Sequence, residues 1–397
     1  MGWLAGMIDA GQDRPLRIAL IPSAFLPSTG GVEQVTLRLA VQLQVLGHQV
    51  EVWSGQRDDD EFPRHDRVEA IPVHRSPFPA PARNTHALVR VIWAGPRELW
   101  HLWRWTRAFC PDVLNVHCFS TNGVYAWVLH RVTHIPLVIS LHGETVMDDH
   151  DAFRRSAFLR RGLQRALQDC QEVTACSTFA LNDVKDRFGL GIMRGVVTPN
   201  GVDLDEGAEP EPVELPFDRF VLAYGRLVRN KGFDLLLEAW AAVTTDSVGL
   251  VIGGAGPALN ELASRATQRD LRGRVMFSGS LSRGQVAWLT SHAEVMIVPS
   301  RVEPFGIVVL EGWRGGCAVL ATKHGGPSEF VRDGVSGILI DPLDRKALTA
   351  SLDAVLGDAT LRSRIAAGGH TAVQSYGWPL AAERYVQVFR RITRDVS

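Results

Sequence analysis

The hydrophobic residues of this 397-residue chain form short runs that alternate with longer stretches of helical spacing. Residues 16–21 form an apolar run typical of a buried strand, and residues 32–46 have the spacing of an amphipathic helix that ends at Gly47. Further strands are predicted at residues 50–53, 113–117, 137–141, 173–175 and 196–197. This alternation is typical of βαβ units in a doubly wound parallel sheet.

The pattern changes at residues 201–216, where six acidic residues and three prolines predict a linker. The alternation then restarts, with a closing helix at residues 378–393 and strands at residues 220–224, 249–253, 275–278, 295–298, 318–322 and 337–339. We expect an α/β protein with Rossmann-like domains at residues 1–200 and 201–376, and a C-terminal helix at residues 377–397 that packs back on the first domain. Because ligands bind at the carboxyl ends of strands in open α/β sheets, the expected site is a cleft where these ends face each other.

Composition narrows the classes of protein that fit. The chain has 42 Lys and Arg against 43 Asp and Glu, a net charge of −1, which weighs against a nucleic-acid-binding protein. A content of 46% hydrophobic and 21% charged residues excludes global disorder. The five cysteines are scattered and form no CxxC pair, so neither a disulfide framework nor a zinc site is indicated. With no signal-peptide pattern and no apolar run of membrane-spanning length, we expect a soluble, cytoplasmic protein.

Two loops that follow predicted strands have features of phosphate sites. Gly30 and Gly31 directly precede a predicted helix, so the backbone can approach a phosphate at the helix N-terminus. A tight turn without a ligand is the alternative. Arg226 and Lys231 follow the strand at residues 220–224, and two cations at the carboxyl end of a strand suit a diphosphate. A solvated basic turn is the alternative there.

The segment PSRVEPFGIVVLE carries the most specific pattern. Glu303 lies in a loop, Phe305 and Gly306 turn the chain, and Ile307 begins a helix with Glu311 one turn later. This order brings together a carboxylate for sugar hydroxyls, helix-start N–H groups for phosphate, and a second carboxylate for a ribose. Taken alone, Glu311 is also explained as a favourable acid in the first turns of a helix. Glu303 has no comparable explanation.

With these segments, the sequence resembles the retaining, nucleotide-sugar-dependent glycosyltransferases of the GT-B fold, specifically carbohydrate-active family four. The resemblance extends from residue 16 to about residue 389, and its most specific sign is the pair of glutamates separated by seven residues. The motifs that carry it are, in family order, GGVE, LHGE, PNGVD, GRLVRNKG, VIGGAGP, PSRVEPFGIVVLE and HGGPSEFV. It implies two facing Rossmann-like domains with a cleft between them.

The resemblance also implies a role for each matching residue. Arg226 and Lys231 would neutralise the donor diphosphate, Glu303 would hold sugar hydroxyls, and Glu311 would bind the ribose. His142 would lie under the transferred sugar, near the scissile bond. The residues expected to contact the donor sugar and diphosphate, mainly through their backbone, are Gly30, Gly31, Phe305, Gly306, Ile307 and Val308.

The sequence gives less information about the residues that would bind the acceptor. His117, Asn122 and Glu144 are the candidate acceptor residues, and a core or turn histidine is an equal interpretation of His117. The acceptor itself stays open among a glycan, a lipid-linked molecule, a cyclitol and a small natural product. A sugar-nucleotide epimerase of the same fold and a non-catalytic sugar-nucleotide-binding protein are the alternatives to a UDP- or GDP-sugar-dependent transferase.

We expect no metal ion and no resident cofactor. The segment at residues 149–151, Asp-His-Asp, mimics the metal motif of the other glycosyltransferase fold. Three-residue acidic patterns are common by chance, and the family that the chain resembles needs no metal. The nucleotide sugar would therefore be a co-substrate that binds without a metal.

A segment rich in Trp and Arg, residues 86–109, stands apart from these motifs. Trp93, Trp100, Trp103 and Trp105 fall within thirteen residues, and Glu98 is the segment's single acid. A basic amphipathic helix with Trp can lie on an anionic membrane surface. The favoured alternative is an ordinary surface helix whose Arg stems cover Trp faces, since Pro96 would kink the helix.

Overall fold

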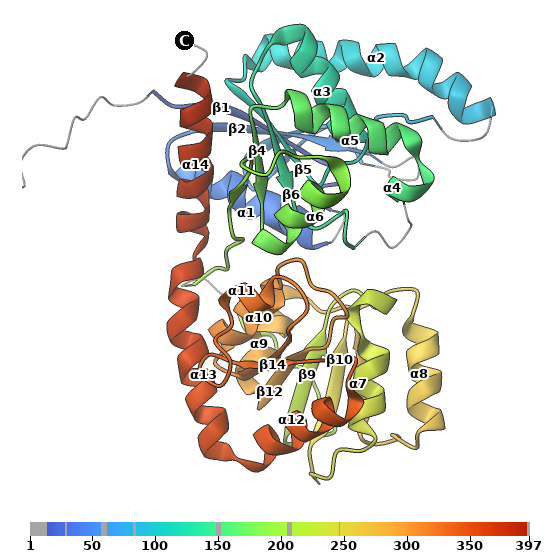
Figure 1. Ribbon diagram of the computed structural model, residues 1–397, viewed down its shortest axis with the longest axis vertical. Helices are drawn as coiled ribbons and strands as arrows, with labels where there is room; N and C mark the ends of the chain where they lie inside the picture. Colours follow the sequence, from blue (N-terminus) through green and yellow to red (C-terminus); the bar gives the residue numbers. More distant parts are fainter. Residues whose placement is uncertain are drawn as a thin grey trace, which may run out of the picture. The chain divides into compact units, whose positions relative to one another are not determined.

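The computed structural model describes residues 14–27, 30–56, 62–81, 85–147, 152–204, 209–245 and 247–394. The prediction of an α/β protein with two parallel-sheet domains is confirmed, because the strands form an eight-stranded and a six-stranded sheet with helices beside each (Figure 1). The chain divides into two compact units, one of Met1–Ile139 with Val386–Ser397 and the other of Ser140–Tyr385. The predicted domain boundaries at residues 200 and 376 stay a prediction.

The larger sheet has the strand order β3-β4-β2-β1-β5-β6-β7-β8. Its strands are β1 (Arg17–Pro22), β2 (Gln49–Gly55), β3 (His65–Val68), β4 (Ile71–Ser76), β5 (Val113–His117), β6 (Leu137–Leu141), β7 (Glu172–Ala175) and β8 (Val196–Val197). β1 pairs in parallel with β2 and with β5, whereas β3 pairs antiparallel with β4. The sequence analysis did not predict β3 and β4.

Six helices accompany this part of the chain, and the predicted helix at residues 32–46 is present as α1. They are α1 (Gly31–Val45), α2 (Thr85–Phe109), α3 (Thr121–Thr133), α4 (Ala152–Arg155), α5 (Ala157–Asp169) and α6 (Thr178–Phe188). α2 runs unbroken through Pro96, so the expected kink does not divide it. β1 and β5 are buried almost throughout, as expected of central strands in a parallel sheet covered on both faces, and β5 is apolar except for Asn115 and His117.

The smaller sheet is parallel throughout, with the order β11-β10-β9-β12-β13-β14. Each of its strands lies where the sequence predicts one to within a residue or two: β9 (Phe220–Tyr224), β10 (Gly249–Gly253), β11 (Val275–Gly279), β12 (Val295–Val298), β13 (Ala318–Thr322) and β14 (Ile338–Ile340). This is the Rossmann order, in which the chain leaves the first strand in one direction and returns to its other side. The switch point therefore lies between β9 and β12.

Helices cover this sheet in two groups. α7, α8 and α12 are neighbours, and so are α9, α10 and α13 (Figure 1). The helices of these groups are α7 (Phe233–Trp240), α8 (Leu259–Gln268), α9 (Arg283–His292), α10 (Ile307–Gly315), α12 (Arg345–Gly357) and α13 (Ala359–Val373). The chain also forms α11 (Pro327–Phe330), two short 3-10 turns, η1 (Arg229–Lys231) and η2 (Gln374–Tyr376), and α14 (Trp378–Arg394), which from Val386 onward belongs to the first compact unit. A continuous apolar core, which includes Leu236, Trp240 and Leu320, fixes the sheet and so the loops at its strand ends.

Candidate functional site

Lys231 and Glu303 meet at the switch point of the smaller sheet. Lys231 ends the η1 turn after β9, Glu303 lies in the loop after β12, and the Lys231 ammonium nitrogen is 2.7 Å from a Glu303 carboxylate oxygen. Gly232 makes this approach possible. Its φ is +71°, and a Cβ there would lie 1.9 Å from the Pro299 carbonyl oxygen. Only a residue without a side chain lets the two loops come so close.

Glu303 is held from several sides and is largely buried. Its carboxylate also accepts a 2.8 Å hydrogen bond from the Ser300 hydroxyl. Its backbone N–H donates to the His324 carbonyl at 3.0 Å, and its carbonyl accepts from the Gly326 N–H at 2.8 Å. Gly325 lies so close that a Cβ would be 2.2 Å from the Glu303 carbonyl oxygen. The HGG loop after β13 thus fixes the position of this carboxylate.

The predicted donor-binding residues Phe305 to Val308 lie together at the start of α10. Gly306, with a φ of +95°, precedes the helix, which begins at Ile307 as predicted. The first N–H groups of a helix have no partner inside it and carry a partial positive charge, so they suit an anionic group. Phe305 is buried and packs against Phe330, with ring centroids 5.1 Å apart. This packing anchors the turn that aims the helix start.

Glu311 lies one turn into α10 and accepts a short hydrogen bond from the hydroxyl of Tyr224. Burial raises the pKa of the Glu311 carboxyl group, although the Tyr224 hydrogen bond and Arg314 oppose the shift. Burial and the Glu311 charge raise the pKa of Tyr224 well above its ordinary value, so its hydroxyl keeps its proton. The sequence analysis missed Tyr224; the available signal was its position as the last residue of β9, directly before the Gly225-Arg226 loop. Arg226 itself is exposed in this loop.

The LHGE loop after β6 lies against the Glu303 loop. Gly143 has a φ of +92°, and a Cβ there would be 2.2 Å from Pro304. The Glu144 carboxylate accepts a 2.8 Å hydrogen bond from the His142 N–H, which closes the loop on itself. Burial lowers the pKa of His142 to about 4, so its imidazole is neutral at pH 7. His142 thus lies beside a residue that neighbours Glu303.

The other predicted residues lie in the first compact unit. Gly30 directly precedes α1 and Gly31 begins it, and both are exposed. His117, the last residue of β5, is fully buried and lies 2.7 Å from the Asn115 carboxamide oxygen. Asn122 is also buried; its carboxamide donates to the Ile21 carbonyl at 2.8 Å and accepts from the Ser120 N–H at 2.9 Å. These contacts favour the core interpretation of His117, and the acceptor role of these residues stays a prediction.

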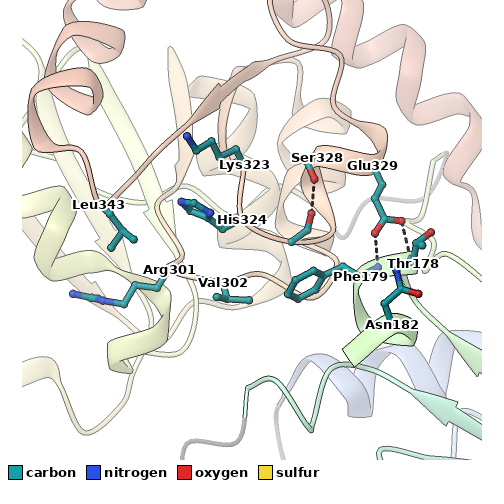
Figure 2. A pocket seen from close by; sticks show the side chains of 11 residues that line it. Thr178, Phe179, Asn182, Arg301, Val302, Lys323, His324, Ser328, Glu329 and Leu343 are labelled. Atoms are coloured by element: carbon teal, nitrogen blue, oxygen red, sulfur yellow. Dashed lines mark hydrogen bonds between the residues drawn. The ribbon is translucent and has the colours of Figure 1, made fainter. Parts of the chain in front are cut away.

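A cavity of about 730 Å³ adjoins the Glu303 loop (Figure 2). Its lining comes from α6, from the two residues before Glu303, and from the segments around α11 and after β14: Thr178, Phe179, Asn182, Arg301, Val302, Lys323, His324, Gly325, Ser328, Glu329 and Leu343. Glu329 accepts hydrogen bonds of 2.8 and 2.6 Å from the N–H groups of Thr178 and Phe179, and so caps α6.

Cations of the cavity wall are paired with acids. Arg301 binds Asp234 through two hydrogen bonds of 2.7 Å. His324 lies 2.9 Å and Lys323 3.1 Å from Asp341, and the hydrogen bond from His324 lowers the pKa of Asp341 to about 2. These side chains were not predicted as site residues from the sequence, because each is paired with a residue distant in the chain.

Residues 149–151, the predicted metal mimic, lie outside the described residues. Within the described ranges, no group of three or more His, Cys, Asp or Glu side chains is arranged to hold a metal ion. No helix in the described part of the chain is long and apolar enough to cross a membrane.

Two protein-family models together match most of the chain. Residues 209–371 match the family model of glycosyl transferases group 1, and residues 29–206 match that of glycosyltransferase family 4. The D-inositol 3-phosphate glycosyltransferase of Xylanimonas cellulosilytica is 28% identical over 399 residues, 92% of each chain. The phosphatidyl-myo-inositol mannosyltransferase of Mycobacterium leprae is 28% identical and covers 96% of this chain and 98% of its own.

Solved structures agree on the fold. Sucrose-phosphate synthase from Thermosynechococcus elongatus superimposes with a TM-score of 0.79 at 20% identity, covering 95% of this chain and 99% of its own. These matches confirm the resemblance and the GT-B fold that the motifs indicated. The chain belongs to glycosyltransferase family 4, the glycosyl transferases of group 1, and has the GT-B fold.

Proposed function

We propose that this protein transfers a sugar from a nucleoside diphosphate sugar of the UDP or GDP type to a hydroxyl group of an acceptor, with retention of configuration at the anomeric carbon. The observation that carries the proposal is the contact of Lys231 with Glu303 at the switch point. This contact lies next to the start of α10, and Glu311 follows one turn into that helix. Anabaena HepE, a solved structure in complex with UDP-glucose, has the same fold with a TM-score of 0.73 at 19% identity, covering 94% of this chain and 99% of its own.

In the proposed reaction, the bond between the anomeric carbon and the diphosphate oxygen breaks, and its electron pair stays on the diphosphate. The acceptor oxygen forms the new bond on the same face of the sugar, and its proton passes to a diphosphate oxygen. Negative charge therefore grows on the leaving group. This charge would be stabilised by the side chains of Lys231 and Arg226 and by the first N–H groups of α10. Their stabilisation is strongest in the transition state, where the leaving group gains its negative charge.

The carboxylates have a separate task in this proposal. Glu303 would accept hydrogen bonds from sugar hydroxyls, and in the ligand-free chain Lys231 and Ser300 hold its carboxylate in place. Glu311, with its partner Tyr224, would bind the ribose. His142 is neutral near pH 7, so it can exchange hydrogen bonds with the sugar without adding charge beside the reacting carbon.

The test begins with a thermal-shift screen of UDP-, GDP- and TDP-sugars, with the matching nucleoside monophosphates as controls for the diphosphate. Donors that stabilise the protein are then incubated with acceptor mixtures, and products are identified by mass spectrometry and the anomeric configuration by NMR. We expect a glycosylated product of unchanged anomeric configuration. An inverted product would contradict retention. Isomerised donor without acceptor would identify an epimerase, and binding without turnover a non-catalytic protein.

A further inference from the structure

We propose that α2 docks this protein on the surface of a bilayer that contains anionic phospholipid. The outer face of α2 is defined here as Val89, Ile92, Trp93, Pro96, Arg97, Trp100, Trp103, Arg104 and Arg107, and each of these residues is exposed. Trp93, Trp100 and Trp103 expose 79%, 50% and 43% of their surface. Large apolar side chains gathered in this way on a water-facing helix mark an interaction site.

The spacing of these residues shows that they form one face. They recur at intervals of three and four, and at about 100° per residue such positions line one side of a helix. The opposite side carries Glu98, Leu102, Trp105 and Thr106, all buried. Trp105 packs against Trp53 of β2, with ring centroids 6.0 Å apart. α2 therefore already has a core-facing side, and its outer face carries a second set of large apolar side chains.

The charges on α2 select an anionic surface. Arg97, Arg104 and Arg107 are exposed beside the tryptophans. The Arg104 guanidinium lies 4.9 Å from the centre of the Trp100 ring, and that of Arg107 lies 5.5 Å from the Trp103 ring. The single acid of the helix, Glu98, faces inward, where it accepts hydrogen bonds from Ser76 at 2.9 Å and Arg64 at 3.3 Å. The outer face is thus cationic and receives no negative charge from its own helix.

This combination fits a lipid headgroup region better than a second copy of the chain. Trp is favoured at the membrane interface, where its ring lies among headgroups and acyl-chain ends, and Arg pairs with lipid phosphates. In a symmetric dimer the same face would have to meet itself, and its three arginines would find no acid on the partner's copy of this face, because Glu98 is buried. An amphipathic helix with Arg and Trp on its exposed face is the arrangement expected of a protein that lies on a membrane without crossing it.

Flotation on vesicles tests the proposal without any activity assay. We expect the protein to float with phosphatidylcholine vesicles that contain phosphatidylglycerol at low salt, and to stay unbound with phosphatidylcholine alone or in high salt. Each Arg near an anionic surface strengthens binding by a factor of about five, so R97Q/R104Q/R107Q, which removes three, should weaken binding by about a hundredfold. W93S/W100S/W103S should also weaken binding, and brominated lipid should quench tryptophan fluorescence of the wild type more than of this variant.

The matched control is I192S/M193S, which removes two exposed apolar side chains after α6 instead of those on α2. This control should float like the wild type. Circular dichroism and thermal unfolding check that all variants are folded, which is expected because the substituted side chains are exposed. The proposal is overturned if the wild type does not float with anionic vesicles at low salt, or if the α2 variants float as well as the control. It is also overturned if light scattering shows that the α2 variants only dissociate a dimer.

Discussion

The ammonium group of Lys231 contacts the carboxylate of Glu303 at 2.7 Å, across 72 positions of the sequence. Each side chain stands at the carboxyl end of its own strand, β9 or β12, and the two strands are neighbours in the sheet. The contact is therefore a product of topology, since the Rossmann order places these two ends beside each other. The contact also holds both groups in a defined position, which the proposed function would use when a donor binds.

Lys231→Ala removes a fixed positive charge expected to face the leaving diphosphate. Loss of one such donor typically raises the barrier by about 3 kcal/mol, so turnover should fall at least about a hundredfold while the fold is kept. Glu303→Ala should lower turnover similarly by loosening the sugar. Steady-state kinetics with the best donor checks both. Lys346→Ala, on the exposed side of α12, is the charge-matched control; if Lys231→Ala retains the control's turnover, the assignment is wrong.

Tyr224→Phe tests the half-buried partner of Glu311. The substitution leaves a half-buried carboxyl group without its hydroxyl donor, which typically costs about 1–3 kcal/mol. We expect a matching loss in the free energy of unfolding and a higher KM for the donor, because Glu311 loses its orientation. Chemical denaturation and donor kinetics measure the two effects. Tyr376→Phe, which removes a partly buried hydroxyl group elsewhere in the same unit, is the comparison, and an equal change in donor KM there would contradict a specific role for Tyr224.

Gly232→Ala tests whether the close approach of the two loops depends on a missing side chain. The new methyl group would overlap the Pro299 carbonyl oxygen, so the η1 turn must move and Lys231 with it. Gly273→Ala is a matched control, because Gly273 has nearly the same φ, +74° against +71°, but no atom within 4 Å of its Cβ position. Both variants carry the backbone cost of about 1–2 kcal/mol.

The difference between these two glycine variants therefore isolates the steric contact. We expect Gly232→Ala to be clearly less stable than Gly273→Ala and to lose most of its turnover, while Gly273→Ala keeps its activity. Thermal unfolding and donor kinetics provide the comparison. Equal stability and equal activity of the two would show that the loops do not need this approach.

The pH dependence of stability should include a contribution from His142. Its pKa is about 4 in the folded chain and about 6.5 when unfolded, so the unfolded chain binds more protons between these values. The folded state should therefore lose stability as the pH falls from about 6.5 to 4, by up to about 3 kcal/mol from this group, and lose no more below that. Denaturation of the wild type and His142→Asn from pH 4 to 8 measures the difference, and parallel curves would contradict the buried neutral imidazole.

The sequence predicted the strands of the smaller sheet well, because each is an apolar run bounded by polar residues. The strands β3 and β4 were not predicted, because neither has the apolar pattern of a buried strand. β3 is largely exposed, and β4 contains Pro72, His74 and Arg75. Arg75 can be buried because its guanidinium pairs with Asp66 at 3.3 Å and donates to the carbonyls of Pro63 at 3.0 Å and Leu26 at 2.7 Å. These partners come together only when the chain folds, so no local sequence pattern predicts that Arg75 is buried.

The residues of the candidate site also divide into those that a local sequence pattern predicts and those that depend on tertiary contacts. Lys231, Glu303 and Glu311 were predicted because they stand at strand ends and a helix start, which the sequence marks with glycines and apolar runs. The sequence analysis predicted neither Tyr224, which contacts Glu311 87 positions away, nor Arg301, which contacts Asp234 67 positions away. Residue type and spacing identify which groups are available, whereas the pairing among them depends on the tertiary fold.

The contact of Glu329 with the start of α6 has a consequence for how the chain is made. Ser177 caps the helix locally by accepting from the Ala180 N–H at 3.1 Å, so this cap is available as soon as α6 has left the ribosome. The N–H groups of Thr178 and Phe179 must wait for a carboxylate about 150 residues further along. At about 5–20 residues per second, translation separates the two events by roughly 8–30 seconds. Until then the N–H groups of Thr178 and Phe179 lack the Glu329 carboxylate, so the rate of translation sets the earliest moment at which the capping of α6 is complete.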